Sequence, residues 1–172
     1  MNRTVIVPTN SPVSSLRSST GVKKVALIQN ISEQLFAYMH FSSYLKPYGH
    51  SCEVFLENYE NDMMTALKEY DPDIIGFQCL TGNLHFGEPI LREYKKYNPN
   101  CLTVMGGAHP TYIPSVACKE GIDAAVTGEA EGAFLDICNQ WDGKLDSIRK
   151  IENVCTYDGD KLIKNPERNV VN

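Results

Sequence analysis

The residues in this sequence that most suggest binding chemistry are a glycine pair and a histidine directly after an apolar run. Residues 101–105 form the run, Gly106 and Gly107 end it, and His109 follows two positions later. Glycine is used where a backbone must turn sharply or lie flat against something bulky. The stretch therefore predicts a backbone that approaches a ligand, and a tight turn without a ligand is the alternative.

Two other apolar runs, at 73–80 and 123–129, end in loops of similar small and polar residues. In an open α/β sheet, ligands bind beyond the carboxyl ends of the strands. We therefore expect the strand ends to form the binding edge of the molecule. The candidate binding residues at this edge are Gln78, Cys79, Leu80, Thr81, Gly106, Gly107, His109, Gly128 and Glu129.

The same loops lack the usual signs of catalysis. No acidic pair follows the first apolar run, as a phosphate-accepting receiver domain would require, and no G-x-G-x-x-G dinucleotide motif stands there. The sequence also has no G-x-S-x-G elbow. The edge suits the binding of a large flat ligand by backbone approach, so we expect neither a catalytic residue nor a metal ligand on this chain.

Alternating strands and helices must bring these loops together. Short apolar runs predict buried strands at 23–29, 51–57, 73–80, 101–107 and 123–129. Helical spacing predicts helices at 32–49, 61–70, 84–97, from about Pro114, and at 131–141. Five β-α units with short links predict an α/β fold, a doubly wound five-stranded parallel sheet with the flavodoxin-like order 2-1-3-4-5.

The two ends of the chain differ from the alternating part. Residues 1–21, rich in Ser, Thr, Asn and Pro, predict a flexible tail, with Ser32 as the N-cap of the first helix. Residues 22–152 are expected to form the binding domain. Residues 153–172 are expected to hold a β-hairpin around Asp158-Gly159 and the start of a linker to a further domain.

Composition narrows the partners and the compartment. The net charge is −5 and there is no basic run, which argues against nucleic acid or an anionic membrane as a partner. The apolar stretches are about five residues long, against about 20 for a membrane span. The six cysteines include no C-x-x-C pair. Reduced, mostly buried thiols in a cytoplasmic protein are the expectation.

Three stretches, "DPDIIGFQCLTGN", "CLTVMGGAHPTYIP" and "GIDAAVTGEAEGAFLDI", together resemble the cobalamin-binding domain at the N-terminus of many radical S-adenosylmethionine (radical SAM) enzymes. The resemblance covers about residues 22–170. It implies a cobalamin-binding module, itself non-catalytic, of a parent methyltransferase or rearrangement catalyst. It also implies a C-terminal radical SAM domain with a four-iron four-sulfur cluster and S-adenosylmethionine. A scaffold or protein-interaction domain of the same fold, without cobalamin, is the alternative.

The motifs of that fold carry over unevenly. The wider fold has D-x-H-x-x-G after strand one, S-x-L after strand three and G-G after strand four. This sequence keeps the glycine pair, has Q-C-L at 78–80, and has "NISEQLFA" at 30–37 with no Asp, His or Gly. The resemblance thus implies cobalt without a histidine as its lower ligand. It also implies that the glycines leave a slot for the nucleotide tail, which Gln78 and Thr81 would hydrogen-bond.

Several other residues are candidates either for contact with a ligand or for a structural role. His109 would face the corrin ring or cap the next segment, and His85 lies near the binding edge. His40 and His50 are expected on the surface. Glu129 and its neighbour Glu131 stand at a helix start, where carboxylates complement the helix dipole. The stripe of Leu35, Tyr38 and Met39 is expected to pack in the core more than against the corrin.

Overall fold

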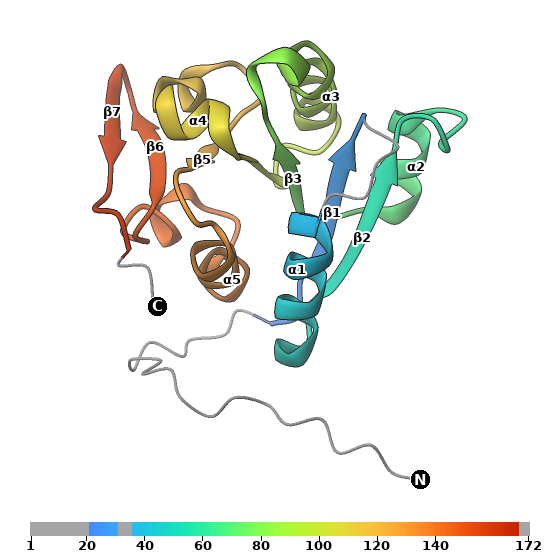
Figure 1. The fold of residues 1–172 in the computed structure, drawn as a ribbon, viewed down its shortest axis with the longest axis horizontal. Coiled ribbons are helices and arrows are strands. Elements are labelled where there is room, and N and C mark those ends of the chain that lie inside the picture. Colours follow the sequence, from blue (N-terminus) through green and yellow to red (C-terminus); the bar gives the residue numbers. More distant parts are fainter. Residues whose placement is uncertain (1–20, 31–35, 169–172) are drawn as a thin grey trace, which may run out of the picture.

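The computed structural model describes residues 21–30 and 36–168 as one sheet covered by helices (Figure 1). The expected tail at 1–20 and the N-cap at Ser32 lie outside the described residues. The strands are β1 (Lys24–Gln29), β2 (Ser51–Leu56), β3 (Ile74–Gln78), β4 (Leu102–Gly106), β5 (Ala124–Val126), β6 (Val154–Asp158) and β7 (Lys161–Lys164). The α-helices are α1 (Phe36–Leu45), α2 (Met63–Tyr70), α3 (Leu84–Tyr97), α4 (Ala108–Tyr112) and α5 (Glu131–Gln140).

The sheet has seven strands in the order β2-β1-β3-β4-β5-β6-β7, so the predicted five-stranded sheet is corrected to a larger, mixed one. The pairs among the first five strands are parallel, and β6 and β7 join antiparallel at the β5 side. The predicted hairpin is present but extends the sheet, because the buried side chains of Val154 and Cys155 cover the edge that β5 would otherwise expose.

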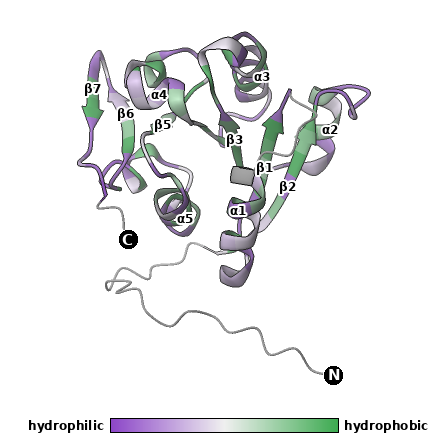
Figure 2. Cartoon of the chain, viewed as in Figure 1, coloured by the Kyte–Doolittle hydropathy of each residue, from purple (hydrophilic) through white to green (hydrophobic). Residues whose placement is uncertain are grey.

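The alternation of side chains along the strands divides the core into two layers. Val25 and Leu27 of β1 point to the face covered by α1 and α5, whereas Ala26 and Ile28 point to the face covered by α2 and α3. Figure 1 shows α1 and α5 below the sheet and α3 and α4 above it. The strands are mostly hydrophobic, as expected for strands buried on both faces (Figure 2).

Helix α4 is the element that the sequence did not predict. A helix was expected only from about Pro114, but α4 begins at Ala108, directly after Gly107, and a 3-10 turn follows from Pro114 to Cys118. Pro110 fits the first turn of α4, where the missing N–H is not needed. Pro114 disfavours helical geometry at Ile113, which separates the two pieces.

Side-chain hydrogen bonds explain the start of α2 and correct the prediction for one histidine. The Asp62 carboxylate accepts from the Thr65 N–H at 2.8 Å and caps α2. His50, expected at the surface, is buried: its Nδ1 accepts from the Lys23 N–H, and its Nε2 lies 3.2 Å from Asn139 Oδ1. A buried imidazole needs both partners, and residues distant in sequence supply them.

Two expectations from the composition concern the cysteines and membrane-spanning helices. All six cysteines are free thiols, and Cys79, Cys101 and Cys155 are buried, as the apolar runs predicted. In the part of the chain that the structure describes, no helix is long and apolar enough to span a bilayer.

Candidate functional site

A cavity of about 150 Å³ opens at the carboxyl edge of the sheet, between the strands and the helices α1 and α5. Parallel strands end at one edge, so loops that are distant in sequence meet there. We call this cavity the slot. Its lining residues are Leu27, Tyr38, Phe41, Gly76, Phe77, Gln78, Val104, Gly106, Gly107, Val126, Gly128, Glu129, Ala130, Glu131 and Phe134.

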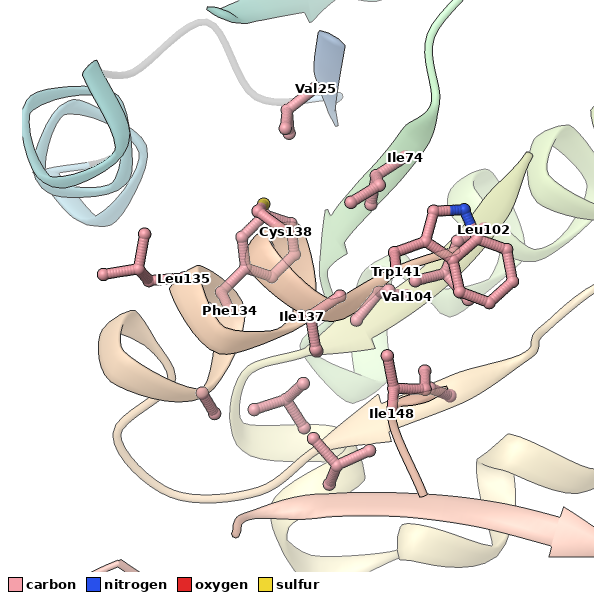
Figure 3. Packing of buried hydrophobic residues seen from close by; sticks show 14 of the residues in the cluster. Val25, Ile74, Leu102, Val104, Phe134, Leu135, Ile137, Cys138, Trp141 and Ile148 are labelled. Atoms are coloured by element: carbon pink, nitrogen blue, oxygen red, sulfur yellow. The ribbon is translucent and has the colours of Figure 1, made fainter. Parts of the chain in front are cut away.

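The floor of the slot is a row of three residues in register across neighbouring strands. Leu27 of β1 pairs with Gly76 of β3, and Gly76 pairs with Val104 of β4. A Cβ on Gly76 would lie 2.7 Å from Leu27 Cδ2 and 3.3 Å from Phe134 Cζ. Figure 3 shows Phe134 on α5, on the side of the sheet toward which Ile74 and Val104 point. The missing side chain of Gly76 therefore lets Leu27 and Phe134 pack close to the backbone of β3, and all three residues line the slot.

Aromatic side chains of α1 and α5 form the opposite wall. The rings of Phe41 and Phe134 lie 5.3 Å apart. The Tyr38 hydroxyl donates to Ile28 O at 2.8 Å and accepts from the Gln78 N–H at 2.8 Å. Burial raises the pKa of Tyr38 far above its ordinary value, so it stays neutral. Tyr38 thereby fixes α1 over strands β1 and β3.

The mouth of the slot carries a polar atom without a protein partner. Gln78 Oε1 is buried, yet among the described residues it finds no hydrogen-bond donor. An unsatisfied buried acceptor costs about 1–3 kcal/mol. Gly128, Glu129 and Glu131 complete the rim on the α5 side. The mouth is therefore rich in acceptors, whereas the floor is apolar.

The two glycines after β4 both line the slot but lie in different surroundings, and their approach to a ligand stays a prediction. Gly107 has φ +97°, and a Cβ there would lie 2.9 Å from Cys79 O and 3.1 Å from Cys79 N. It is glycine because the chain turns tightly against the end of β3. At Gly106 the nearest atom to a Cβ is Val126 O, at 4.0 Å, so only this glycine leaves open space.

Four of the nine predicted site residues lie outside the slot lining and join its two loops. The His109 N–H donates to Cys79 O at 3.0 Å, and its Nδ1 lies 3.1 Å from Thr81 Oγ1. The Cys79 thiol is buried, which raises its pKa to about 11. Leu80 is exposed on the same edge. His109 thus links the segment after β4 to the segment after β3. Whether it also faces a corrin ring stays a prediction.

Five predicted residues, Gln78, Gly106, Gly107, Gly128 and Glu129, do line the slot. The sequence reasoning missed the floor, and its strongest available signal was Gly76 within the apolar run "DIIGF". A glycine inside a buried strand often marks a close approach of another group. Tyr38 was expected to belong to the core; it is buried and also lines the slot.

Two further observations concern metals and the remaining histidines. Over residues 21–30 and 36–168, no group of three or more His, Cys, Asp or Glu side chains could hold a metal ion. His85 is exposed and lines a second hollow of about 450 Å³ on the α2 and α3 side, together with Asn30 and Asp62. The absence of a histidine ligand to cobalt stays a prediction, because most of the loop after β1 lies outside the described residues.

Residues 37–137 match the family model of the B12 binding domain, and this range contains the mouth and most of the floor of the slot. The chain belongs to the B12-binding domain family. The match confirms the resemblance to cobalamin-binding domains that the strand-end motifs suggested. It also agrees with the observed fold, in which a parallel α/β sheet opens into a slot at its carboxyl edge.

Several curated proteins are similar to this B12-binding domain. Anaerobic magnesium-protoporphyrin IX monomethyl ester cyclase of Rubrivivax gelatinosus is 32% identical over 129 residues, 69% of this chain and 23% of that protein. An uncharacterized methyltransferase of Pyrococcus horikoshii is 34% identical over 79 residues, 45% and 17% of the two chains. Cytidylyl-2-hydroxyethylphosphonate methyltransferase of Streptomyces wedmorensis is 30% identical over 81 residues, 44% and 15%. The chain thus spans less than a quarter of each of these relatives.

Proposed function

We propose that this B12-binding domain holds cobalamin with the corrin ring across the carboxyl edge of the sheet and the nucleotide tail in the slot. The observation that carries the proposal is the unpaired, buried Gln78 Oε1 at the mouth of an apolar cavity. Apolar cavities of about 150 Å³ accept an aromatic ring such as benzene. The size and the apolar floor of the slot therefore fit the ring of a nucleotide base.

Different residues of the slot would contact different parts of the nucleotide tail. Leu27, Gly76 and Val104 would lie under the base, with Phe134 above it. Gln78 Oε1 would accept a hydrogen bond from a hydroxyl or amide of the cofactor, which removes the cost of an unpaired buried acceptor. Gly106 would let the tail pass the end of β4.

The loops next to the slot would support the corrin ring. The bonds between Cys79, Thr81 and His109 hold the segments after β3 and β4 in one arrangement. Leu80, 47% exposed, and Tyr112, 85% exposed, place apolar surface on these same two segments. When bound, cobalamin supplies a cobalt centre for methyl transfer or radical chemistry. The residues of this chain bind and orient the cofactor, and we assign them no catalytic step.

We further propose that the chain is one module of a larger radical SAM enzyme, a methyltransferase or a rearrangement catalyst. Two of the relatives carry the name methyltransferase, and each relative is at least four times as long as the matched region. A four-iron four-sulfur cluster and S-adenosylmethionine would belong to a C-terminal domain of that enzyme. The free thiols suit a reducing, cytoplasmic setting. A C-x-x-x-C-x-x-C motif downstream in the gene is the direct check on the module assignment.

The contacts of the last described residues support this arrangement. Asn153 Nδ2 donates to Glu129 O, and the Arg168 N–H donates to Asn153 Oδ1 at 2.6 Å. Arg168 also pairs with Asp136 of α5. Residues 165–168 therefore return beside the loop that forms the rim of the slot. A domain that continued from this point would lie close to the corrin face. The alternative, a scaffold without cobalamin, does not account for the unpaired Gln78 in an open slot.

Gel filtration with hydroxocobalamin tests the proposed binding. The parent protein is expected to retain the colour of the cofactor through the column. Gly106→Leu would fill the mouth of the slot and abolish retention. Gln78→Leu keeps a side chain of similar length without its amide, and is expected to weaken binding about tenfold. Gln140→Leu, at the opposite end of α5 from the rim, is the matched control and should bind like the parent.

The outcomes separate cofactor binding from its location. If the parent protein retained no colour, cobalamin binding by this domain would be wrong. If Gly106→Leu and Gln78→Leu both bound as tightly as the Gln140→Leu control, the cofactor would bind elsewhere and the slot assignment would be wrong. Circular dichroism of each variant shows whether the fold is kept.

A further inference from the structure

The deep part of the slot offers a bound ring almost nothing but carbon. Leu27, Val104 and Val126 present methyl groups from three strands, and each is at most 2% exposed. Phe41 and Phe134 close the opposite side. A polar atom carried to this depth would lose its bound water and meet apolar side chains, which is costly unless a new partner is found.

The polar groups that border this deep part are already engaged. The Tyr38 hydroxyl both donates, to Ile28 O, and accepts, from the Gln78 N–H. Around the floor, the backbone of β1, β3 and β4 is paired in the parallel ladders. Gln78, the last residue of β3, lines the slot and carries a buried side-chain acceptor without a partner among the described residues. Within the described residues, the slot thus has a single orphan acceptor at the mouth and none on its floor.

Corrinoids differ in the base at the end of the nucleotide tail, and the slot distinguishes two chemical classes of base. A methylated benzimidazole carries methyl groups and, when detached from cobalt, one free ring nitrogen. Adenine carries several ring nitrogens and an amino group, and each needs a hydrogen-bond partner once it is buried. Gln78 Oε1 can accept a hydrogen bond from a sugar hydroxyl or from one amino N–H, but it cannot pair with the ring nitrogens of a base, which are acceptors themselves. A benzimidazole brings one such nitrogen into the slot, whereas a purine brings several.

We propose that the slot selects the lower base of its corrinoid by polarity, and prefers a methylated benzimidazole to a purine. The inference rests on the proposed function, because it assumes that the nucleotide tail enters the slot. The side chains responsible are the methyl groups of Leu27, Val104 and Val126, and the engaged hydroxyl of Tyr38.

Three corrinoids that share the same ring system test the proposal by isothermal titration calorimetry. Cobinamide lacks the base, cobalamin carries dimethylbenzimidazole, and adeninylcobamide carries adenine in its place. Cobalamin is expected to bind at least about tenfold more tightly than adeninylcobamide, because each additional unpaired buried polar group of the purine weakens binding by about that factor. Cobalamin should also bind more tightly than cobinamide.

A pair of matched variants locates the discrimination. Val104→Thr places one hydroxyl in the wall of the slot at nearly constant volume, and should narrow the ratio of the two dissociation constants about threefold. Val25→Thr makes the same change on the same face of the sheet, at a buried position that does not line the slot. The ratio should then remain that of the parent protein.

The outcomes distinguish this inference from the proposed function. If none of the three corrinoids bound, the proposed function and the inferred base preference would both be wrong. Equal affinity for cobinamide and cobalamin would show that the corrin binds while the base stays outside the slot, which overturns the inference alone. Adeninylcobamide binding as tightly as cobalamin would also overturn it, as would an unchanged ratio in Val104→Thr.

Discussion

Each face of the sheet has a buried or closely packed glycine whose added Cβ would meet neighbouring side chains, but only one face contains the slot. On the α1 and α5 face, a Cβ on Gly76 of β3 would meet the movable ends of the Leu27 and Phe134 side chains, and these three residues border the slot. On the other face, Gly87 of α3 lacks a side chain because the ring of Phe77 occupies the space. A Cβ on Gly87 would lie 2.2 Å from Phe77 Cδ1.

The comparison shows that a buried glycine has no single meaning. Gly76 and Phe77 are neighbours in the chain, and the pleat directs them to opposite faces. One face is therefore closed by an aromatic ring that fits against a helix, and the other is left open under two helices. An open apolar volume in a protein interior loses dispersion contacts, so its persistence favours a ligand that restores them.

The largest expected effect comes from opening the closed face. Phe77→Ala removes a ring that is 2% exposed and packs against Gly87, and should lower the free energy of unfolding by about 3–5 kcal/mol. Denaturant unfolding followed by circular dichroism measures the change. Phe86→Ala is the control, because Phe86 lies 5.9 Å from the Phe77 ring but is only partly buried. An equal or larger loss in Phe86→Ala would contradict the assignment of Phe77 as the residue that closes this face.

The sequence could predict the mouth of the slot but not its floor. Gln78, Gly106, Gly128 and Glu129 come at the ends of apolar runs, and in a parallel sheet all such ends lie at one edge. The floor depends on the pairing of Leu27, Gly76 and Val104 across three strands. That register follows from tertiary packing, which a single sequence does not display.

Two features of the fold, the extension of the sheet and the burial of His50, could not be predicted from the sequence for similar reasons. The alternation of apolar runs predicted five parallel strands and their helices. It did not predict that the hairpin extends the sheet. The pairing of the hairpin with β5 is a long-range contact, which Val154 and Cys155 of the hairpin make with the last two residues of β5. His50 looked like a surface residue because its partners, Lys23 and Asn139, are distant in sequence. Burial of a polar residue depends on such partners.

Alkaline pH gives a second, smaller test of the closed face. Cys101, 1% exposed on the α2 and α3 side, has its pKa raised by burial from 9.0 to about 12. Above pH 9 the unfolded chain therefore releases a proton that the folded chain keeps, so stability falls as the pH rises from about 9 to 12. Between pH 8 and 10 this one thiol should account for about 1.4 kcal/mol.

The variant Cys101→Ala isolates this contribution. Its stability should fall less between pH 8 and 10 than that of the parent protein, by about the same 1.4 kcal/mol, although its stability at pH 8 is lower. Ile122→Val, at another buried position on the same face, removes no titratable group and is the control, so its curve should run parallel to that of the parent protein. Parallel curves for the parent and Cys101→Ala would show that water reaches Cys101 and that this face is less closed than the structure indicates.

The smallest expected effect separates the two faces most sharply, through the same substitution at Gly76 and Gly87. In Gly76→Ala the new Cβ meets the flexible ends of Leu27 and Phe134, which can move into the slot. The free energy of unfolding should fall by less than about 1 kcal/mol, whereas the narrowed slot should weaken cobalamin binding about fivefold, or about 1 kcal/mol.

In Gly87→Ala the strain against Phe77 is partly offset by the better helix propensity of alanine, so the free energy of unfolding should fall by about 1 kcal/mol. Cobalamin affinity per folded molecule should not change, because Gly87 does not line the slot. Unfolding and calorimetric titration of both variants give the four values. If Gly87→Ala weakened binding as much as Gly76→Ala, the two faces would not act separately, and the slot that Gly76 lines would not be the binding site.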